Sequence, residues 1–123
     1  MKNLVTVYDF TTEFNNFYIN SSKIILEEYN KNSINRNIID KVYDVLENYK
    51  NEIVRTLEYK VLSVEKAGKL LCDEMEKFLQ LANNCYEYYE YTYDLKYYET
   101  YVFLNSIIDC YNELCEELGY EEI

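Results

Sequence analysis

The sequence has no proline, no histidine and only two glycines, Gly68 and Gly119. Because proline and glycine form most tight turns, their scarcity argues against a sheet of many hairpins and favours long helices. The absence of histidine removes the commonest residue for proton transfer and a common ligand of zinc. The composition therefore predicts an all-α protein and gives no support for a metal centre.

Motifs that carry catalysis are also missing. The chain has neither a glycine-rich phosphate loop nor a GxSxG nucleophile motif. Carboxylates three residues apart do occur, as in Glu87 with Glu90 and Glu113 with Glu116. Ferritin-like metal sites add a histidine three residues after a glutamate, and no histidine is present. We therefore expect a protein that is not an enzyme and that binds no metal and no cofactor.

The four cysteines, Cys72, Cys85, Cys110 and Cys115, include no CxxC pair. We expect them to be reduced and to lie in or near the core, where a free cysteine packs as a small apolar residue. The N-terminal residues lack the apolar run and cleavage site of an export signal, and no segment has the apolar length of a membrane span. The expected location is the cytoplasm, in a bacterial host cell, without membrane association.

The length predicts a single helical domain over residues 1–123, folded as a bundle of three to four long antiparallel helices. Apolar spacing predicts helices over residues 9–29, 38–57 and 71–82. Residues 2–8 and 58–64 suit either a helix or a minor β element. Gly68 marks either a turn or a close helix crossing. Asn83 and Asn84 offer a break, although the third helix and the last one are also compatible with a continuous rod.

The last stretch, residues 84–119, has the clearest pattern and is predicted to be one long helix. Its apolar stripe has steps of three and four and consists of Tyr97, Tyr101, Leu104, Ile108, Tyr111, Cys115 and Leu118, widened by Phe103, Ile107 and Leu114. On the opposite side the same helix would carry a polar ridge of Glu87, Tyr91, Asp94, Tyr98, Asn105, Asp109, Asn112, Glu113 and Glu116. From Glu87 to Glu116 this acidic ridge would extend about 44 Å.

Eight tyrosines fall within residues 86–101. On one helix they point all around the axis. Tyr86, Tyr89, Tyr93 and Tyr97 are then expected to face the bundle, and Tyr88, Tyr91 and Tyr98 to project from it. Exposed tyrosine rings favour protein interfaces and accept stacked arginine side chains. The alternative is a compositional bias with hydroxyl groups facing solvent.

The net charge of −11 is unevenly distributed. Residues 85–123 hold ten carboxylate side chains and one amine, that of Lys96. Such a surface repels nucleic acid and anionic lipid and attracts basic surfaces, which are commonest on nucleic-acid-binding proteins. A carboxylate run is also often just a solvated helix face. The expected partner is therefore the basic surface of a nucleic-acid-binding protein or nucleoprotein complex, without direct nucleic-acid binding.

Two functional hypotheses follow. The first is a non-catalytic inhibitor that mimics nucleic acid and occupies a basic groove. Size, acidity and helical pattern suit the broad class of phage or mobile-element anti-defence proteins, including anti-CRISPR-like inhibitors, although no family motif is present. The second is an assembly or chaperone-like protein that pairs with itself, for instance as a homodimer, or with a client through apolar helix seams. The candidate partner-binding residues are Glu87, Tyr88, Tyr91, Asp94, Tyr98, Asp109, Glu113 and Glu116.

Overall fold

The computed structural model describes residues 4–59 and 62–123, and this part of the chain contains helices and no strand. The first half contains α1 (Val7–Lys31), α2 (Arg36–Tyr49), the π-helical turn η1 (Lys50–Val54) and α3 (Arg55–Glu58), and the second half contains α4 (Val64–Thr92) and α5 (Leu95–Leu118). Because α2, η1 and α3 follow one another without a gap, they form a single rod.

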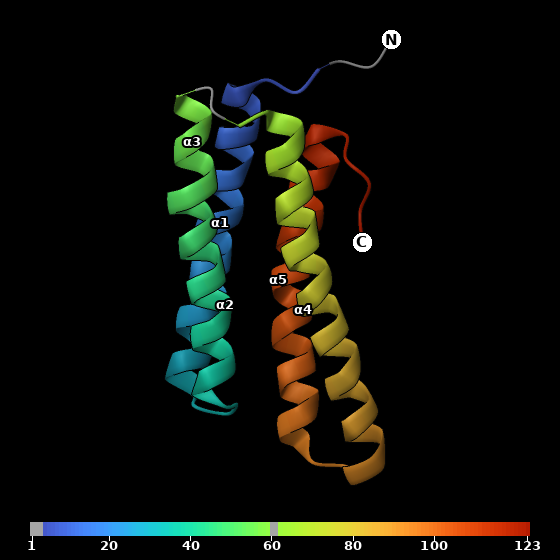
Figure 1. Ribbon diagram of the computed structural model, residues 1–123. Coiled ribbons are helices and arrows are strands. Elements are labelled where there is room, and N and C mark those ends of the chain that lie inside the picture. Colours follow the sequence, from blue (N-terminus) through green and yellow to red (C-terminus); the bar gives the residue numbers. More distant parts are fainter. Residues whose placement is uncertain (1–3, 60–61) are drawn as a thin grey trace.

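The helices form an antiparallel bundle in which the chain runs alternately down and up, and the start of α1 and the end of α5 lie at the same end of the bundle (Figure 1). α5 packs along α4 on one side and along α1 on the other, and α1 also packs against α2. This arrangement confirms the prediction of an all-α bundle of long antiparallel helices.

Side-chain caps determine where three of the helices begin. Thr6 and Asp9 form a reciprocal capping box before α1, and the Ser63 hydroxyl accepts a hydrogen bond from the Lys66 amide before α4. The Asn35 side chain caps α2 in the same way. The alternative of a minor β element over residues 2–8 and 58–64 is therefore wrong for the described residues, because the caps place Val7 and Val64 in first helical turns. Residues 2, 3, 60 and 61 lie outside the described part.

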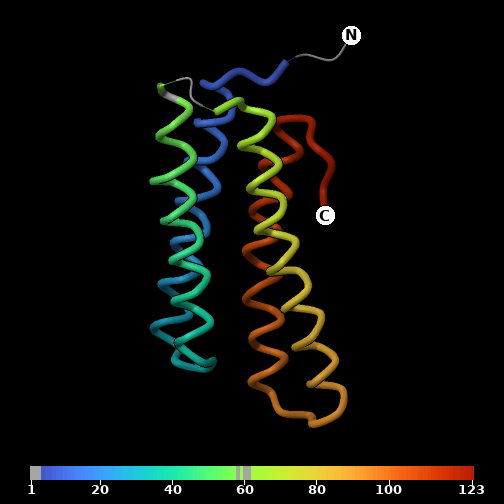
Figure 2. The backbone as a smooth tube through the Cα atoms, viewed as in Figure 1, coloured from blue at the N-terminus to red at the C-terminus, as the bar shows by residue number. Residues whose placement is uncertain are grey.

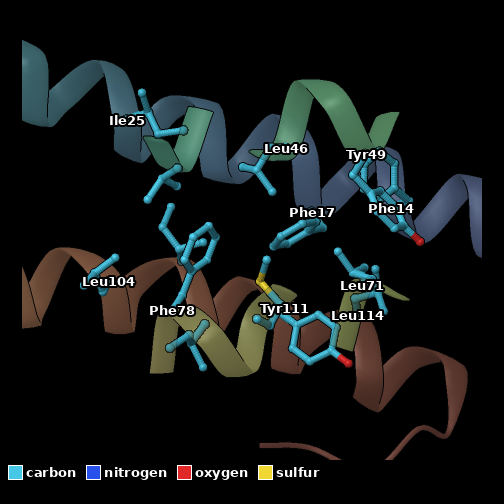
Figure 3. Packing of buried hydrophobic residues seen from close by; sticks show 14 of the residues in the cluster. Phe14, Phe17, Ile25, Leu46, Tyr49, Leu71, Phe78, Leu104, Tyr111 and Leu114 are labelled. Atoms are coloured by element: carbon cyan, nitrogen blue, oxygen red, sulfur yellow. The ribbon is translucent and has the colours of Figure 1, made fainter. Parts of the chain in front are cut away.

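One cluster of buried side chains joins all the long helices, as the close view in Figure 3 shows. Aromatic rings connect its parts. The Phe14 ring centroid lies 5.1 Å from that of Tyr49, and the Phe17 centroid lies 6.3 Å from that of Tyr111. Fully burying one such side chain contributes roughly 1.5–3 kcal/mol to the free energy of unfolding. The predicted seam residues Leu104, Ile108, Tyr111 and Cys115 are all buried in this cluster.

The π-helical turn η1 keeps the apolar side of the rod formed by α2, η1 and α3 facing the core. The buried residues of α2 end at Tyr49, and the next ones are Val54 and Leu57. A step of five residues from Tyr49 to Val54 fits the wider π turn and returns the apolar side to the interior. As a result Val54 is buried, whereas the preceding Ile53 is half-buried.

α4 runs without interruption through Gly68 and through Asn83 and Asn84. Asn83 and Asn84 are exposed residues within the helix, so of the two alternatives for this pair the chain takes the continuous helix rather than the break. Gly68 also lies within α4, where it allows a close approach. A Cβ atom at this position would lie 3.2 Å from the ring of Tyr120. The C-terminal residues fold back beside α5, and Asn112 exchanges two hydrogen bonds with the backbone of Ile123.

The buried Tyr49 hydroxyl donates a hydrogen bond of 2.6 Å to the Ala67 carbonyl oxygen and so ties α2 to α4. We expect the Tyr49→Phe variant to lose about 1 kcal/mol of unfolding free energy, because the ring stays and only the hydrogen bond is removed. Urea denaturation measures this loss. The matched control is Tyr43→Phe, at an exposed position of α2, which should change stability by less than about 0.5 kcal/mol. Equal effects would show that the bond contributes nothing.

Candidate protein-binding surface

The predicted single helix over residues 84–119 is interrupted by a two-residue turn at Tyr93 and Asp94. Tyr93 ends α4 in the left-handed conformation, with φ of 53°. Its amide nitrogen donates to the Tyr89 carbonyl oxygen at 2.7 Å. The Asp94 carboxylate then accepts a hydrogen bond of 3.0 Å from the Lys96 amide and caps α5. The prediction of one long helix is therefore wrong, and Asp94 has a structural role in the turn.

The turn divides the predicted acidic ridge between two antiparallel helices. Tyr89 points toward α5, because its ring centroid lies 5.2 Å from that of Tyr98. Glu87 and Tyr91 are each two positions from Tyr89, about 200° around the helix, so they point away from α5. The ring of Tyr88, by contrast, stacks on that of Tyr97 in α5, with 5.4 Å between the ring centroids. A continuous ridge of about 44 Å on one helix face is therefore ruled out.

The remaining candidate residues stay together on α5. Tyr98, Asp109 and Glu116 are spaced by eleven and seven residues, close to three and two helical turns, and all three are exposed. Glu113 lies on the flank of α5 that faces α1. The structure thus places the α5 members of the predicted site on one side of that helix and turns Glu87 and Tyr91 away from them, whereas the ring of Tyr88 contacts that of Tyr97, next to Tyr98 in the chain.

α1 contributes carboxylates that sequence reasoning missed. Two adjoining hollows between α1 and α5 form an acidic groove that is lined, among other residues, by Asp9, Glu13, Glu113, Glu116 and Glu117. None of the five carboxylates forms an ion pair within the described residues. The acids of α1 have no signal in the sequence that links them to α5, since only tertiary packing makes the two helices neighbours.

Seven of the eight tyrosines fall within residues 86–98, which contain the turn between α4 and α5 and which we call the hairpin tip. Figure 2 shows this turn at one end of the bundle. Tyr91 is 87% exposed and Tyr93 is 77% exposed. The expectation that Tyr93 faces the bundle is therefore wrong, whereas Tyr88, Tyr91 and Tyr98 are exposed as expected. Tyr86 and Tyr97 are also partly exposed, at 40% and 38%. The reason is that the tip extends past the ends of α1 and α2, so there is little bundle for these rings to face.

The tyrosine rings contact one another in two groups. Tyr86 and Tyr101 lie 4.9 Å apart between centroids, and the same group continues through Tyr98 and Tyr89 to Tyr93. The second group is the Tyr88 and Tyr97 pair, with an angle of 27° between the ring planes. Such ring contacts add roughly 0.5–1.5 kcal/mol per pair beyond the burial of area. The tip is thus an aromatic surface whose rings support one another.

Within residues 4–59 and 62–123, no three or more cysteine, aspartate or glutamate side chains are grouped so that they could hold a metal ion. All four cysteines are free, with Cys85 and Cys115 buried and Cys72 and Cys110 half-buried, which agrees with positions in or near the core. Burial raises the pKa of each thiol above its ordinary value of 9.0.

Every helix of the described chain is too short or too polar to span a lipid bilayer.

Comparisons of the chain with protein-family models, with curated proteins and with solved structures found no match.

Two variants distinguish the hydrogen bond that the Asp94 side chain accepts at the start of α5 from the effect of its negative charge. We expect Asp94→Ala to lower the unfolding free energy by about 1 kcal/mol, because the Lys96 amide loses its acceptor. Asp94→Asn keeps an acceptor and removes only the charge, so its effect should be a few tenths of a kcal/mol. Chemical denaturation of the two variants checks this. Equal losses in both variants would assign the stabilisation to the carboxylate charge instead.

The raised thiol pKa values predict lower stability at alkaline pH. Below pH 9.0, the ordinary thiol value, folded and unfolded chains both keep these protons. Above it the unfolded chain loses them first, so the unfolding free energy falls by up to about 1.4 kcal/mol per pH unit per buried thiol. Urea denaturation from about pH 7 to about pH 10.5 tests this prediction. A Cys85→Ala variant should show a smaller fall, and an unchanged slope would contradict the assignment.

Proposed function

We propose that this chain is a non-catalytic binding protein that docks its acidic surface onto the basic, nucleic-acid-binding surface of a protein partner and blocks it. The observation that carries this proposal is the acidic groove between α1 and α5. Five carboxylates from two helices line it without ion pairs in the described residues. A bundle gains no folding energy from such crowding of like charges, which suggests an external partner.

The distribution of charge supports a basic partner. Ten carboxylates and one amine fall in residues 85–123, which include the whole of α5. Such a field raises the rate of encounter with basic surfaces and weakens as salt is added. Direct binding of nucleic acid is disfavoured by the same repulsion. The proposed place of action is the cytoplasm of a bacterial cell.

The length of α5 is compatible with mimicry of nucleic acid. Asp94 and Glu116 are separated by 22 positions, or about 33 Å along the helix, close to the length of one turn of duplex DNA. The acids of α1 broaden the charged surface beside it. A basic groove that accommodates one turn of a duplex could therefore accept this side of the bundle, and inhibition by occupation of that groove is the proposed mechanism.

Assembly through apolar seams is supported less well by the geometry. Leu104 and Ile108, which such a seam would have to present, are 0% and 3% exposed. They pack within the chain's own core, so neither a client nor a second copy can reach them without opening the bundle. The charged surface is the better candidate for contact with a partner.

The test is an affinity pull-down from a nuclease-treated bacterial lysate. Wild type is compared with Glu113→Lys/Glu116→Lys, which reverses two charges of the acidic groove. The matched control is Asp40→Lys/Asp44→Lys, which makes the same charge change at exposed positions of α2. We expect wild type and the control to retain a nucleic-acid-binding protein, and the groove variant to lose it. Added DNA or RNA and higher salt should release that protein.

Circular dichroism first establishes that each variant is folded. If no nucleic-acid-binding protein is retained, or if nucleic acid fails to displace the retained one, the proposed function is wrong. Equal losses in the groove variant and the control would show that net charge, rather than the groove, determines binding.

A further inference from the structure

The hairpin tip extends beyond the loop that joins α1 and α2. That loop, residues 32–35, lines a hollow together with Cys85, Asp94, Lys96, Tyr97 and Thr100. The turn between α4 and α5 reaches farther than this loop and forms the free end of the hairpin (Figure 1). A protruding tip of this kind can enter a concave surface that the flat sides of the bundle cannot reach.

The two most exposed rings of the tip are those of Tyr91 and Tyr93, and only the Tyr93 ring is supported by a neighbouring ring in the described residues. Tyr93 packs edge-on against Tyr89 at 6.2 Å, and Tyr89 in turn contacts Tyr98 of α5 at 5.2 Å. Tyr91 stands on the outward side of the last turn of α4 and is 87% exposed. Because tyrosine has few rotatable bonds and Tyr93 is already supported by its neighbours, little conformational freedom is lost when a partner covers these rings.

Tyr91 has a carboxylate one turn before it on α4, because Glu87 precedes it by four residues. Residues four apart lie next to one another on a helix surface, with Cβ atoms about 5–6 Å apart. Glu90 lies in the last turn of α4, three residues before Tyr93, which follows the helix in the left-handed conformation. Neither glutamate forms an ion pair within the described residues. The tip therefore offers an aromatic ring face beside a free carboxylate at Tyr91, and a second exposed ring and a second free carboxylate close by in the chain.

An aromatic face beside a carboxylate favours a cation, and the planar guanidinium of arginine fits both groups. It stacks on a tyrosine ring and donates two parallel hydrogen bonds to a carboxylate, whereas the lysine ammonium acts as a point charge. A second copy of this chain would bring carboxylates against carboxylates. Nucleic acid and anionic lipid are repelled for the same reason. Charge complementarity thus selects a basic protein segment as the occupant.

We propose that the hairpin tip is an arginine-binding surface, in which a guanidinium group of a protein partner stacks on Tyr91 and pairs with Glu87, and Tyr93 and Glu90 add a second ring and a second carboxylate to the contact. This inference rests on the proposed function in taking the partner to be a basic protein. It adds that arginine is preferred over lysine and that the tip, rather than the acidic groove alone, is a centre of the contact.

The experiment uses two synthetic glycine–serine peptides that differ only in carrying arginine or lysine at the same positions. Titrations followed by NMR give their affinities for the full chain. The tip variant is Tyr91→Ala/Tyr93→Asn, in which asparagine tolerates the left-handed conformation and net charge is unchanged. The control is Tyr43→Ala/Tyr59→Ala, which removes two exposed rings from other parts of the chain.

Wild type and control should bind the arginine peptide roughly fivefold more tightly than the lysine peptide, and the tip variant should lose most of that preference. The shifted wild-type signals should include those of Tyr91 and Tyr93. The proposal is overturned if wild type binds both peptides equally or neither, or if the tip and control variants behave alike.

The lysate pull-down separates this inference from the proposed function. If the tip variant retains the nucleic-acid-binding partner as well as wild type does, the function stands and the tip inference fails. If the peptides show the arginine preference but no nucleic-acid-binding partner is found, the tip inference stands and the proposed function fails.

Discussion

The reversal of the chain at Tyr93 and Asp94 is the constraint on which the rest of the surface depends. It folds α5 back along α4, and α5 then packs against α1 as well. The same turn gathers eight tyrosines at one end of the bundle and moves Glu87 and Tyr91 away from the acids of α5. The turn is held by side chains rather than by glycine. The Thr92 hydroxyl donates to the Tyr88 carbonyl oxygen, and the Asp94 carboxylate caps α5.

The interior of the bundle is held together by apolar packing, whereas its surface has few ion pairs. Inside, aromatic and aliphatic side chains from all the long helices form one cluster, and the π-helical turn η1 returns Val54 and Leu57 to it. Outside, the described residues contain only two ion pairs, Lys31 with Glu28 and Lys77 with Glu74. Neither involves α5 or the acidic groove. Like charges left unpaired in this way slightly destabilise a bundle, so the unpaired carboxylates of the groove and the tip add nothing to folding through ion pairs.

Much of the fold could be predicted from the sequence, because apolar spacing along each helix reports directly on burial. Leu104, Ile108, Tyr111 and Cys115 were predicted in the seam of the last helix and are buried. The turn at Tyr93 could not be detected in this way. The apolar spacing continues through it, from Ala82, Cys85 and Tyr89 to Thr100 and Leu104, in steps that also suit an unbroken helix. The only local signals were Thr92 and Asp94, which favour helix ends.

The sequence by itself determined the helical class, the core side of each helix and the excess of negative charge, since periodicity and composition are local properties of the chain. Only the tertiary structure decided which charged and aromatic side chains became neighbours. The acids of α1 joined those of α5, and most of the tyrosines gathered around the turn between α4 and α5. The physical reason is that a two-residue reversal changes the spatial relation of every residue on either side of it, whereas it leaves the pattern of apolar spacing almost unchanged.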